Sequence, residues 1–214
     1  FAVDKPMDRF GPHWVGHPEK VARAWRARVR DSDTVLVCGD TSWAMRLEEA
    51  LPDLAWLEAL PGRKVLLRGN HDYWWASLAK VRRALQPGAT ALQNDSIEVE
   101  GWQVCGSRGW SLPAPESTPQ DRGIYQRELD RLRLSLESAQ RGTPRLAMLH
   151  YPPYDVATGT SPVLDLLLEF DVKWCVYGHL HAVLPGTYPE GLHRGIQFRC
   201  VSVDLADFAP ARIL

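Results

Sequence analysis

Short apolar runs recur along the chain and alternate with longer amphipathic segments. Four of these runs are almost wholly apolar, which is typical of strands buried on both faces, and they cover residues 34–38, 64–67, 146–149 and 173–177. Between them, apolar side chains spaced three and four positions apart predict helices over residues 18–30 and 121–141. The alternation of strands and helices predicts an α/β fold.

Two further segments alternate strictly between polar and apolar residues. Residues 96–105 form two such runs that meet at Glu100-Gly101, which predicts a β-hairpin. Residues 196–203 alternate in the same way and predict one more strand. Antiparallel strands therefore accompany the parallel ones, and we expect residues 1–214 to form a single α/β sandwich domain.

Composition and charge narrow the possible partners and compartment. The chain has 25 Lys and Arg against 26 Asp and Glu, so its net charge of -1 gives no general attraction to nucleic acid or anionic membranes. No basic groove with interleaved aromatic residues is evident, and a polynucleotide partner is not expected. No apolar stretch approaches the roughly 20 residues that span a bilayer. The four cysteines are dispersed without CxxC spacing, which favours reduced core residues and a cytoplasmic protein.

Polar residues able to bind metal follow each of the four apolar runs. In chain order these blocks are Gly39-Asp40, Gly69-Asn70-His71-Asp72, His150 and Gly178-His179-Leu180-His181. Ligands bind at the carboxyl ends of strands in open α/β sheets, so we expect the blocks to converge in space. The glycines allow a sharp turn and a close approach to an ion. A mixture of nitrogen and oxygen donors suits Mn, Fe or Zn better than calcium.

The four blocks, in this order, resemble the calcineurin-like metallophosphoesterase superfamily, whose pattern is D-x-H, G-D, G-N-H-D/E, H and G-H-x-H. Single blocks occur by chance in many chains, so the resemblance depends on all four in sequence over residues 35–203. Residues 70–75 and 106–110 are also similar to a bacterial subgroup of predicted phosphohydrolases. The resemblance implies an α-β-β-α sandwich of mixed sheets flanked by helices, and a phosphoric ester hydrolase.

The resemblance also implies a centre of two divalent metal ions, Mn, Fe or Zn, with five ligands: Asp40, Asn70, His150, His179 and His181. Asp40 would bridge the ions, and His181 would belong to the second site while the others complete the first. The ions would acidify a bridging water, and the resulting hydroxide would attack phosphorus. His71 would protonate the leaving oxygen or stabilise the transition state, and Asp72 would orient its imidazole.

The first block of the family pattern, D-x-H, is missing. Asp4 and Asp8 both lack a histidine two positions later, and the chain begins with Phe1 in place of Met. We therefore expect that about ten N-terminal residues, including the first strand, are absent from this sequence. A homologue that lacks the block is the alternative. Either way, the second metal site keeps only Asp40 and His181.

Two functions follow from this pattern. The first is a metal-dependent phosphoesterase that hydrolyses mono- or diesters, with a small phosphoester as substrate. The alternative is a non-catalytic metal-binding module of the same fold with a structural or partner-binding role. The pattern specifies neither the natural substrate nor the oligomeric state, because one fold and metal pair serve many substrates.

Several other residues have both a functional and a structural interpretation. Arg108 follows the second hairpin strand, where it would clamp a phosphate with two hydrogen bonds or simply be solvated. Aromatic residues follow the first two metal blocks and form either a wall for a substrate ring or part of the core: Trp43, Tyr73, Trp74 and Trp75. Surface or supporting roles are favoured for His13, His17 and His193. The first two of these histidines would touch substrate if the segment before residue 18 covers the metals.

Overall fold

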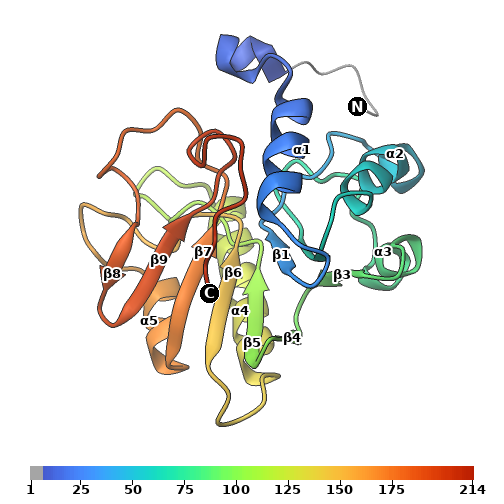
Figure 1. Cartoon of the computed structure of the whole chain (residues 1–214). Helices are drawn as coiled ribbons and strands as arrows, with labels where there is room; N and C mark the ends of the chain where they lie inside the picture. Colours follow the sequence, from blue (N-terminus) through green and yellow to red (C-terminus); the bar gives the residue numbers. More distant parts are fainter. Residues whose placement is uncertain (1–6) are drawn as a thin grey trace.

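Within residues 7–214, which the computed structural model describes, two β-sheets lie face to face with helices on their outer sides (Figure 1). The helices are α1 (His17–Arg28), α2 (Leu47–Glu58), α3 (Leu78–Ala84), α4 (Pro119–Glu137) and α5 (Pro162–Glu169), preceded by 3-10 turns at Met7–Phe10 and Pro12–Trp14. The strands are β1 (Thr34–Val37), β2 (Arg63–Leu67), β3 (Ala89–Leu92), β4 (Ser96–Val99), β5 (Trp102–Ser107), β6 (Arg145–Leu149), β7 (Val172–Tyr177), β8 (Gly191–His193) and β9 (Ile196–Cys200).

One sheet is parallel and the other is mixed. The three-stranded sheet has the order β1-β2-β3, with parallel pairing throughout. The six-stranded sheet has the order β4-β5-β6-β7-β9-β8, in which β4 and β8 are antiparallel edge strands and the inner strands are parallel. The four apolar runs form β1, β2, β6 and β7, and the predicted hairpin is β4-β5. The predicted α/β fold with mixed sheets flanked by helices is therefore confirmed.

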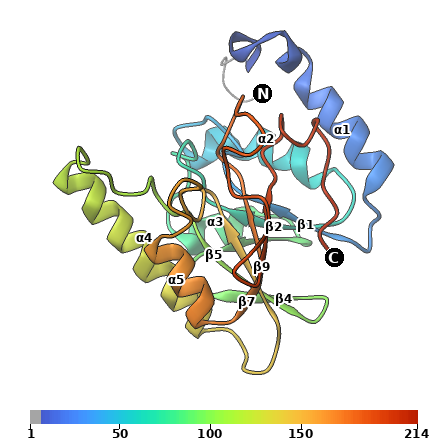
Figure 2. The same cartoon turned by 90° about the vertical axis from the view of Figure 1, so that its left-hand side faces the viewer.

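Each central strand contributes to two hydrophobic cores because successive side chains point to opposite faces. In β6, Leu146 and Met148 pack between the two sheets, whereas Ala147 and Leu149 pack on the other face in the core that α4 and α5 cover. A third core joins the three-stranded sheet to α1, α2 and α3. Figure 2 shows α4 and α5 together on one side of the sheets and α1 and α2 on the other.

The helices of the six-stranded sheet begin at side-chain caps. Thr118 accepts a hydrogen bond from the Asp121 N–H at the start of α4, and Ser161 accepts from the Leu164 N–H at the start of α5. Proline occupies the first position of both helices, where its missing N–H costs nothing. These caps fix where each helix begins.

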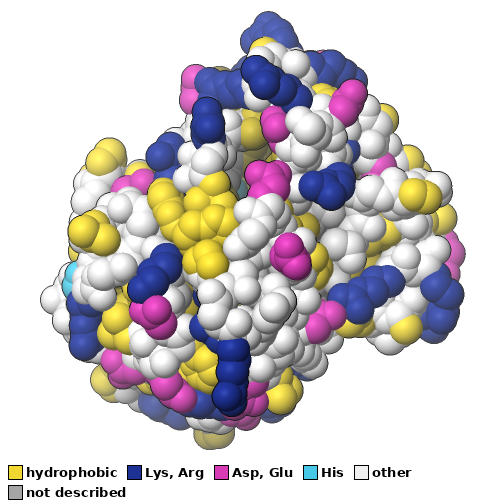
Figure 3. Space-filling model, turned by 60° about the horizontal axis from the view of Figure 1, so that its bottom comes forward, with side chains coloured by type: hydrophobic (Ala, Val, Ile, Leu, Met, Phe, Trp, Pro, Cys, Tyr) yellow, Lys and Arg dark blue, Asp and Glu magenta, His cyan; other side chains and the backbone are white. Residues whose placement is uncertain are grey.

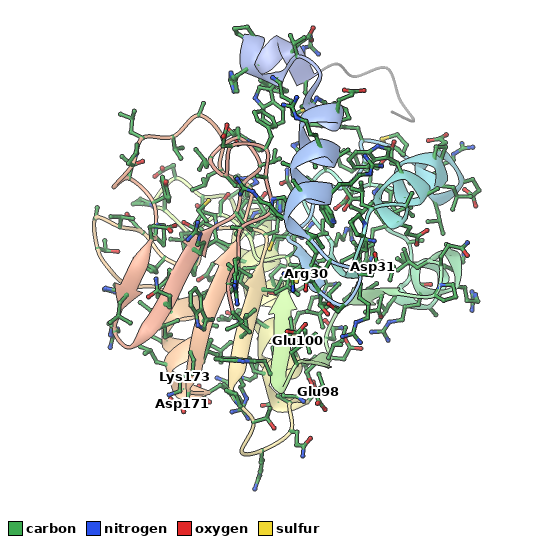
Figure 4. All side chains as sticks on the ribbon, in the orientation of Figure 1. Arg30, Asp31, Glu98, Glu100, Asp171 and Lys173 are labelled. Carbon is green, nitrogen blue, oxygen red and sulfur yellow. The ribbon has the colours of Figure 1, made fainter. Side chains whose placement is uncertain are left out.

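The carboxyl ends of the parallel strands lie at one edge of the sandwich. Charged residues that belong to none of the metal-binding blocks lie away from that edge. Figure 4 labels charged residues that lie near strand starts and at a hairpin: Arg30 and Asp31 before β1, Glu98 and Glu100 at the β4-β5 hairpin, and Asp171 and Lys173 at the start of β7. Asp171 and Lys173 form an exposed ion pair with each other. The residues with metal-binding chemistry are thus collected at the carboxyl edge of the strands.

The four cysteines are core residues, and the surface in Figure 3 carries charges of both signs. All four cysteines are buried and free, and burial raises the pKa of the Cys38 thiol well above its ordinary value. On the face in Figure 3, basic and acidic side chains are intermixed around a patch of hydrophobic ones. In the described part of the chain, every helix is too short or too polar to cross a bilayer.

Candidate metal centre

Four of the five predicted metal ligands meet at the carboxyl edge of the strands. The Asn70 Oδ1 atom lies 2.6 Å from His150 Nε2 and 3.0 Å from His179 Nδ1. The Asp40 Oδ2 atom lies 3.5 Å from His150 Nε2. One ligand atom from each of Asp40, His150 and His179 lies within 4.8 Å of the others. Side chains that follow β1, β2, β6 and β7 thus converge on one point.

The hydrogen bonding of His150 prepares its outer nitrogen for a metal ion. Its Nδ1–H donates to the Cys38 carbonyl oxygen at 2.7 Å, so Nε2 carries the lone pair that faces Asn70 and His179. Burial is the main cause that lowers the pKa of His150 to about 4, and burial followed by the neighbouring His150 does the same for His179. Both imidazoles are therefore neutral at pH 7, which is the form that binds metal.

The chemistry of this donor set fits a divalent cation. The His150 Nε2 lone pair, the Asn70 amide oxygen and the Asp40 carboxylate all present negative charge density to one another. Such groups repel unless a positive charge lies between them. Burial raises the pKa of the Asp40 carboxyl, and a bound cation would oppose that shift. Nitrogen and oxygen donors together suit Mn, Fe or Zn.

The glycines of the first two blocks allow the strand ends to approach each other. A Cβ on Gly39 would lie 2.6 Å from the Gly69 Cα, and Gly39 has a φ of +97°. A Cβ on Gly69 would lie 2.1 Å from the Asp40 Oδ1 atom. At Gly178 the nearest atom to a Cβ would be 3.5 Å away, an ordinary contact. Close approach therefore explains two of the three motif glycines, and the third has room for a methyl group.

Asp72 has a different position from the one expected. Its side chain is fully buried, and its carboxylate accepts hydrogen bonds from five N–H groups of the described residues: the backbone of Asp40, Thr41, Ser42 and Gly69, and the Trp74 indole. Within residues 7–214, no hydrogen bond joins it to the His71 imidazole. Asp72 therefore holds the loops after β1 and β2 together and does not orient His71.

His71 lies beside Asp40 and is enclosed by aromatic rings. Its backbone N–H donates to Asp40 Oδ1 at 2.8 Å, which ties the predicted acid to the predicted metal-binding carboxylate. Its ring packs against Trp43 at a centroid distance of 4.0 Å and against the edge of Tyr73 at 6.1 Å. Trp74, by contrast, is buried in the core. Trp75 is also buried in the core. Of the four aromatic residues after the metal blocks, Trp43 and Tyr73 therefore contact His71, and the other two belong to the core.

His181, the fifth predicted ligand, lies outside the group of three but is held by a carboxylate. Its Nδ1–H donates to Asp204 Oδ1 at 2.8 Å, and the Ala182 N–H donates to the second oxygen at 3.0 Å. The Trp14 ring lies 5.4 Å from the His181 ring. A carboxylate that orients a histidine in this way commonly supports a metal ligand. Asp204 lies in a segment without any motif, so sequence reasoning missed it.

Arg108 flanks the site through its backbone. Its carbonyl oxygen accepts hydrogen bonds from the backbone N–H groups of His150 and Tyr151. Its guanidinium donates to the buried Glu128 at 3.0 Å and lies over the Trp110 ring at 4.8 Å. A phosphate contact by Arg108 stays a prediction.

The three remaining histidines make contacts away from the metal-binding group. His13 packs against Trp14 and Phe208, and the His17 Nδ1 atom lies 3.2 Å from the Trp14 carbonyl oxygen. His193 stacks on Tyr154. The segment before α1 approaches His181 through Trp14 and not through these histidines. Residues 1–6, which include Asp4, lie outside the described residues.

A sandwich of two sheets with clustered nitrogen and oxygen donors at the strand ends defines a metal-binding α/β protein. The chain belongs to the calcineurin-like phosphoesterase family, whose sequence model matches residues 12–183. This match confirms the predicted superfamily and points to metal-dependent hydrolysis of phosphoesters as its general chemistry.

Individual relatives are distant. The Gene 66 protein of Mycobacterium phage L5 is 25% identical over 178 residues, which cover 83% of this chain and 70% of that protein. A crystal structure of a protein of unknown function from Aquifex aeolicus aligns with a TM-score of 0.48 and 17% identity, over 91% of this chain and 80% of that one.

Proposed function

We propose that this protein hydrolyses phosphate mono- or diesters with the help of two divalent metal ions, Mn, Fe or Zn. The convergence of the Asp40, Asn70, His150 and His179 donor atoms on one point is the observation that carries the proposal. Family membership supports the general chemistry. A small phosphoester is the proposed substrate, since the chain lacks the basic excess that a polynucleotide would favour.

The residues of the chain have distinct tasks in this reaction. Divalent ions held at Asp40 would polarise the phosphoryl oxygens and lower the pKa of a water molecule. The water releases one proton to the solvent, and its oxygen bonds to phosphorus while the bond from phosphorus to the leaving oxygen breaks. His71, on the backbone hydrogen bond to Asp40, supplies the proton that the leaving oxygen takes up. His181, oriented by Asp204, serves the second ion.

Metal removal and two substitutions test the proposal. The purified protein should hydrolyse p-nitrophenyl phosphate or bis-p-nitrophenyl phosphate in the presence of Mn²⁺, lose turnover in EDTA and regain it when Mn²⁺ is restored. Replacing His71 with alanine should lower kcat for phenyl phosphate, whose leaving group needs a proton, by about 10²-fold or more, the usual contribution of a general acid. Asp40→Asn should weaken Mn²⁺ binding as well as turnover, because it removes a charged ligand.

The outcomes separate the two candidate functions. Undiminished turnover in both Asp40→Asn and His71→Ala would contradict the proposed site. Bound Mn²⁺ without turnover of either ester would instead support the non-catalytic metal-binding module. Elemental analysis of the same preparations gives the number of ions bound per chain.

Substituting Asp204 tests the role of His181. We expect Asp204→Asn to weaken the binding of one Mn²⁺ ion by about 10- to 100-fold, because the carboxylate no longer fixes the tautomer and orientation of the imidazole. Isothermal titration calorimetry with Mn²⁺ measures the change. Asp207→Asn, at an exposed aspartate three residues away, is the matched control. Equal affinities in the two variants would show that Asp204 does not support a metal ligand.

A further inference from the structure

The His71 imidazole lacks the hydrogen bond that usually fixes a proton-donating histidine. Its Nδ1 atom is buried and has no hydrogen-bond partner among the described residues. The adjacent Asp72, which sequence reasoning assigned to this task, is occupied by five other N–H donors. Some other contact must therefore set the ring orientation, since a proton donor works only at a defined distance and angle.

The Trp43 indole provides such a contact. The two ring centroids lie 4.0 Å apart with an interplanar angle of 34°, so the rings overlap at close range. Tyr73 approaches the same imidazole edge-on, but at 6.1 Å and with its own side chain 48% exposed. Trp43 is thus the nearer of the two aromatic neighbours.

The backbone on both sides of Trp43 is firmly anchored. The Ser42 N–H donates to Asp72 Oδ1 at 3.1 Å, and the Ser42 hydroxyl donates to the buried Asp53 carboxylate at 2.5 Å. The Ala44 N–H donates back to the Ser42 hydroxyl oxygen at 3.2 Å, and Ala44 is fully buried. The indole is therefore presented from a rigid support, which is what a precise site requires.

We propose that Trp43 is a positioning residue that holds the His71 imidazole in the orientation from which it delivers a proton to the leaving oxygen. This inference rests on the proposed phosphoesterase function. In this arrangement ring stacking on Trp43, and not a hydrogen bond, orients the His71 imidazole. Trp43 acts only through His71, so its effect should appear where proton delivery matters and disappear when His71 is absent.

Kinetics with two leaving groups test the proton-delivery step. In Mn²⁺, Trp43→Leu should lower kcat for phenyl phosphate, a poor leaving group that needs a proton, by about 10- to 100-fold. The same variant should change kcat for p-nitrophenyl phosphate much less, because that leaving group departs without protonation. Trp43→Phe, which keeps an aromatic ring, should restore most of the lost activity. In the His71→Ala background, Trp43→Leu should have no further effect on either ester.

NMR of histidine-labelled protein tests the stack without any need for turnover. In the unsubstituted protein, the ring protons of His71, assigned by their loss in His71→Ala, should be shifted upfield by the Trp43 ring current. Trp43→Leu should remove this shift and broaden or average the signals. Trp102→Leu, which alters a half-buried tryptophan on β5 away from the site, should leave the His71 signals and the kinetics unchanged.

Each result decides for or against the inference. Identical His71 signals in Trp43→Leu and the unsubstituted protein would overturn it, as would equal losses with both leaving groups or a further loss in the His71→Ala background. Circular dichroism of Trp43→Leu identifies unfolding, in which case Trp43→Phe and Trp43→Tyr give the answer through the same NMR shifts. Absence of turnover in the unsubstituted protein would instead contradict the proposed function, and the NMR result would still decide whether Trp43 fixes His71.

Discussion

Replacing Asp72 with alanine should lower the free energy of unfolding by about 3–5 kcal/mol. The substitution would leave five N–H groups around a fully buried position without an acceptor. Each buried donor without a partner costs about 1–3 kcal/mol, and water entering the space vacated by the side chain would recover part of that cost. Urea denaturation followed by circular dichroism measures the loss.

A graded series makes the Asp72 result interpretable. Asp72→Asn keeps one oxygen but turns an NH₂ group toward N–H donors, so about half the loss is expected. Asp171→Asn, at an exposed position far from the site, should stay within about 0.5 kcal/mol of the unsubstituted protein. A change at Asp72→Ala no larger than that of Asp171→Asn would show that the carboxylate does not hold the two loops together.

Replacing Gly69 with alanine should reduce kcat by about 10²-fold or more and weaken Mn²⁺ binding. The added methyl group would lie 2.1 Å from Asp40 Oδ1 and 2.2 Å from the Asp40 nitrogen, so the carboxylate that is proposed to bind metal must move. A displacement of about 1 Å in a catalytic group can cost 10²-fold in rate. Steady-state kinetics with p-nitrophenyl phosphate and calorimetric titration with Mn²⁺ measure the two effects.

Gly178 is the matched control because, like Gly69 before Asn70, it directly precedes a predicted metal ligand, His179. Its added methyl group would meet nothing closer than 3.5 Å, so Gly178→Ala should keep kcat and Mn²⁺ affinity within about twofold. If both variants lose activity equally, the close contact between Gly69 and Asp40 is not the reason that glycine occupies position 69.

Strands β2, β6 and β7 could be predicted from the sequence because they are largely buried on both faces and so consist mainly of apolar residues, whereas the short strands β3 and β8 were missed. β2 and β6, for example, are buried over four successive residues. Helix α2 was missed, and its sequence explains why: Pro52 lies inside it, and Arg46 occupies its N-cap position. Proline usually breaks helices, and arginine is not a typical capping residue. Tertiary packing of Leu54 and Leu57 stabilises this helix despite both signals.

Most of the candidate site could be predicted because its ligands directly follow strands, and strand ends converge in this kind of fold. Asp40, Asn70, His150 and His179 were found in this way. The supporting contacts could not be found, because they join residues distant in sequence and depend on loop conformation. Asp72 reaches Asp40 from 32 positions away, and Asp204 reaches His181 from 23. No spacing rule relates such partners.

The His150 ring donates its Nδ1–H to a backbone carbonyl, that of Cys38, so this hydrogen bond does not depend on the side chain at position 38. A main-chain acceptor is contributed equally by any residue at position 38. The proton of the His150 ring is therefore directed by the path of the chain as it leaves β1, and exchange of the thiol for another small apolar group would leave that direction intact.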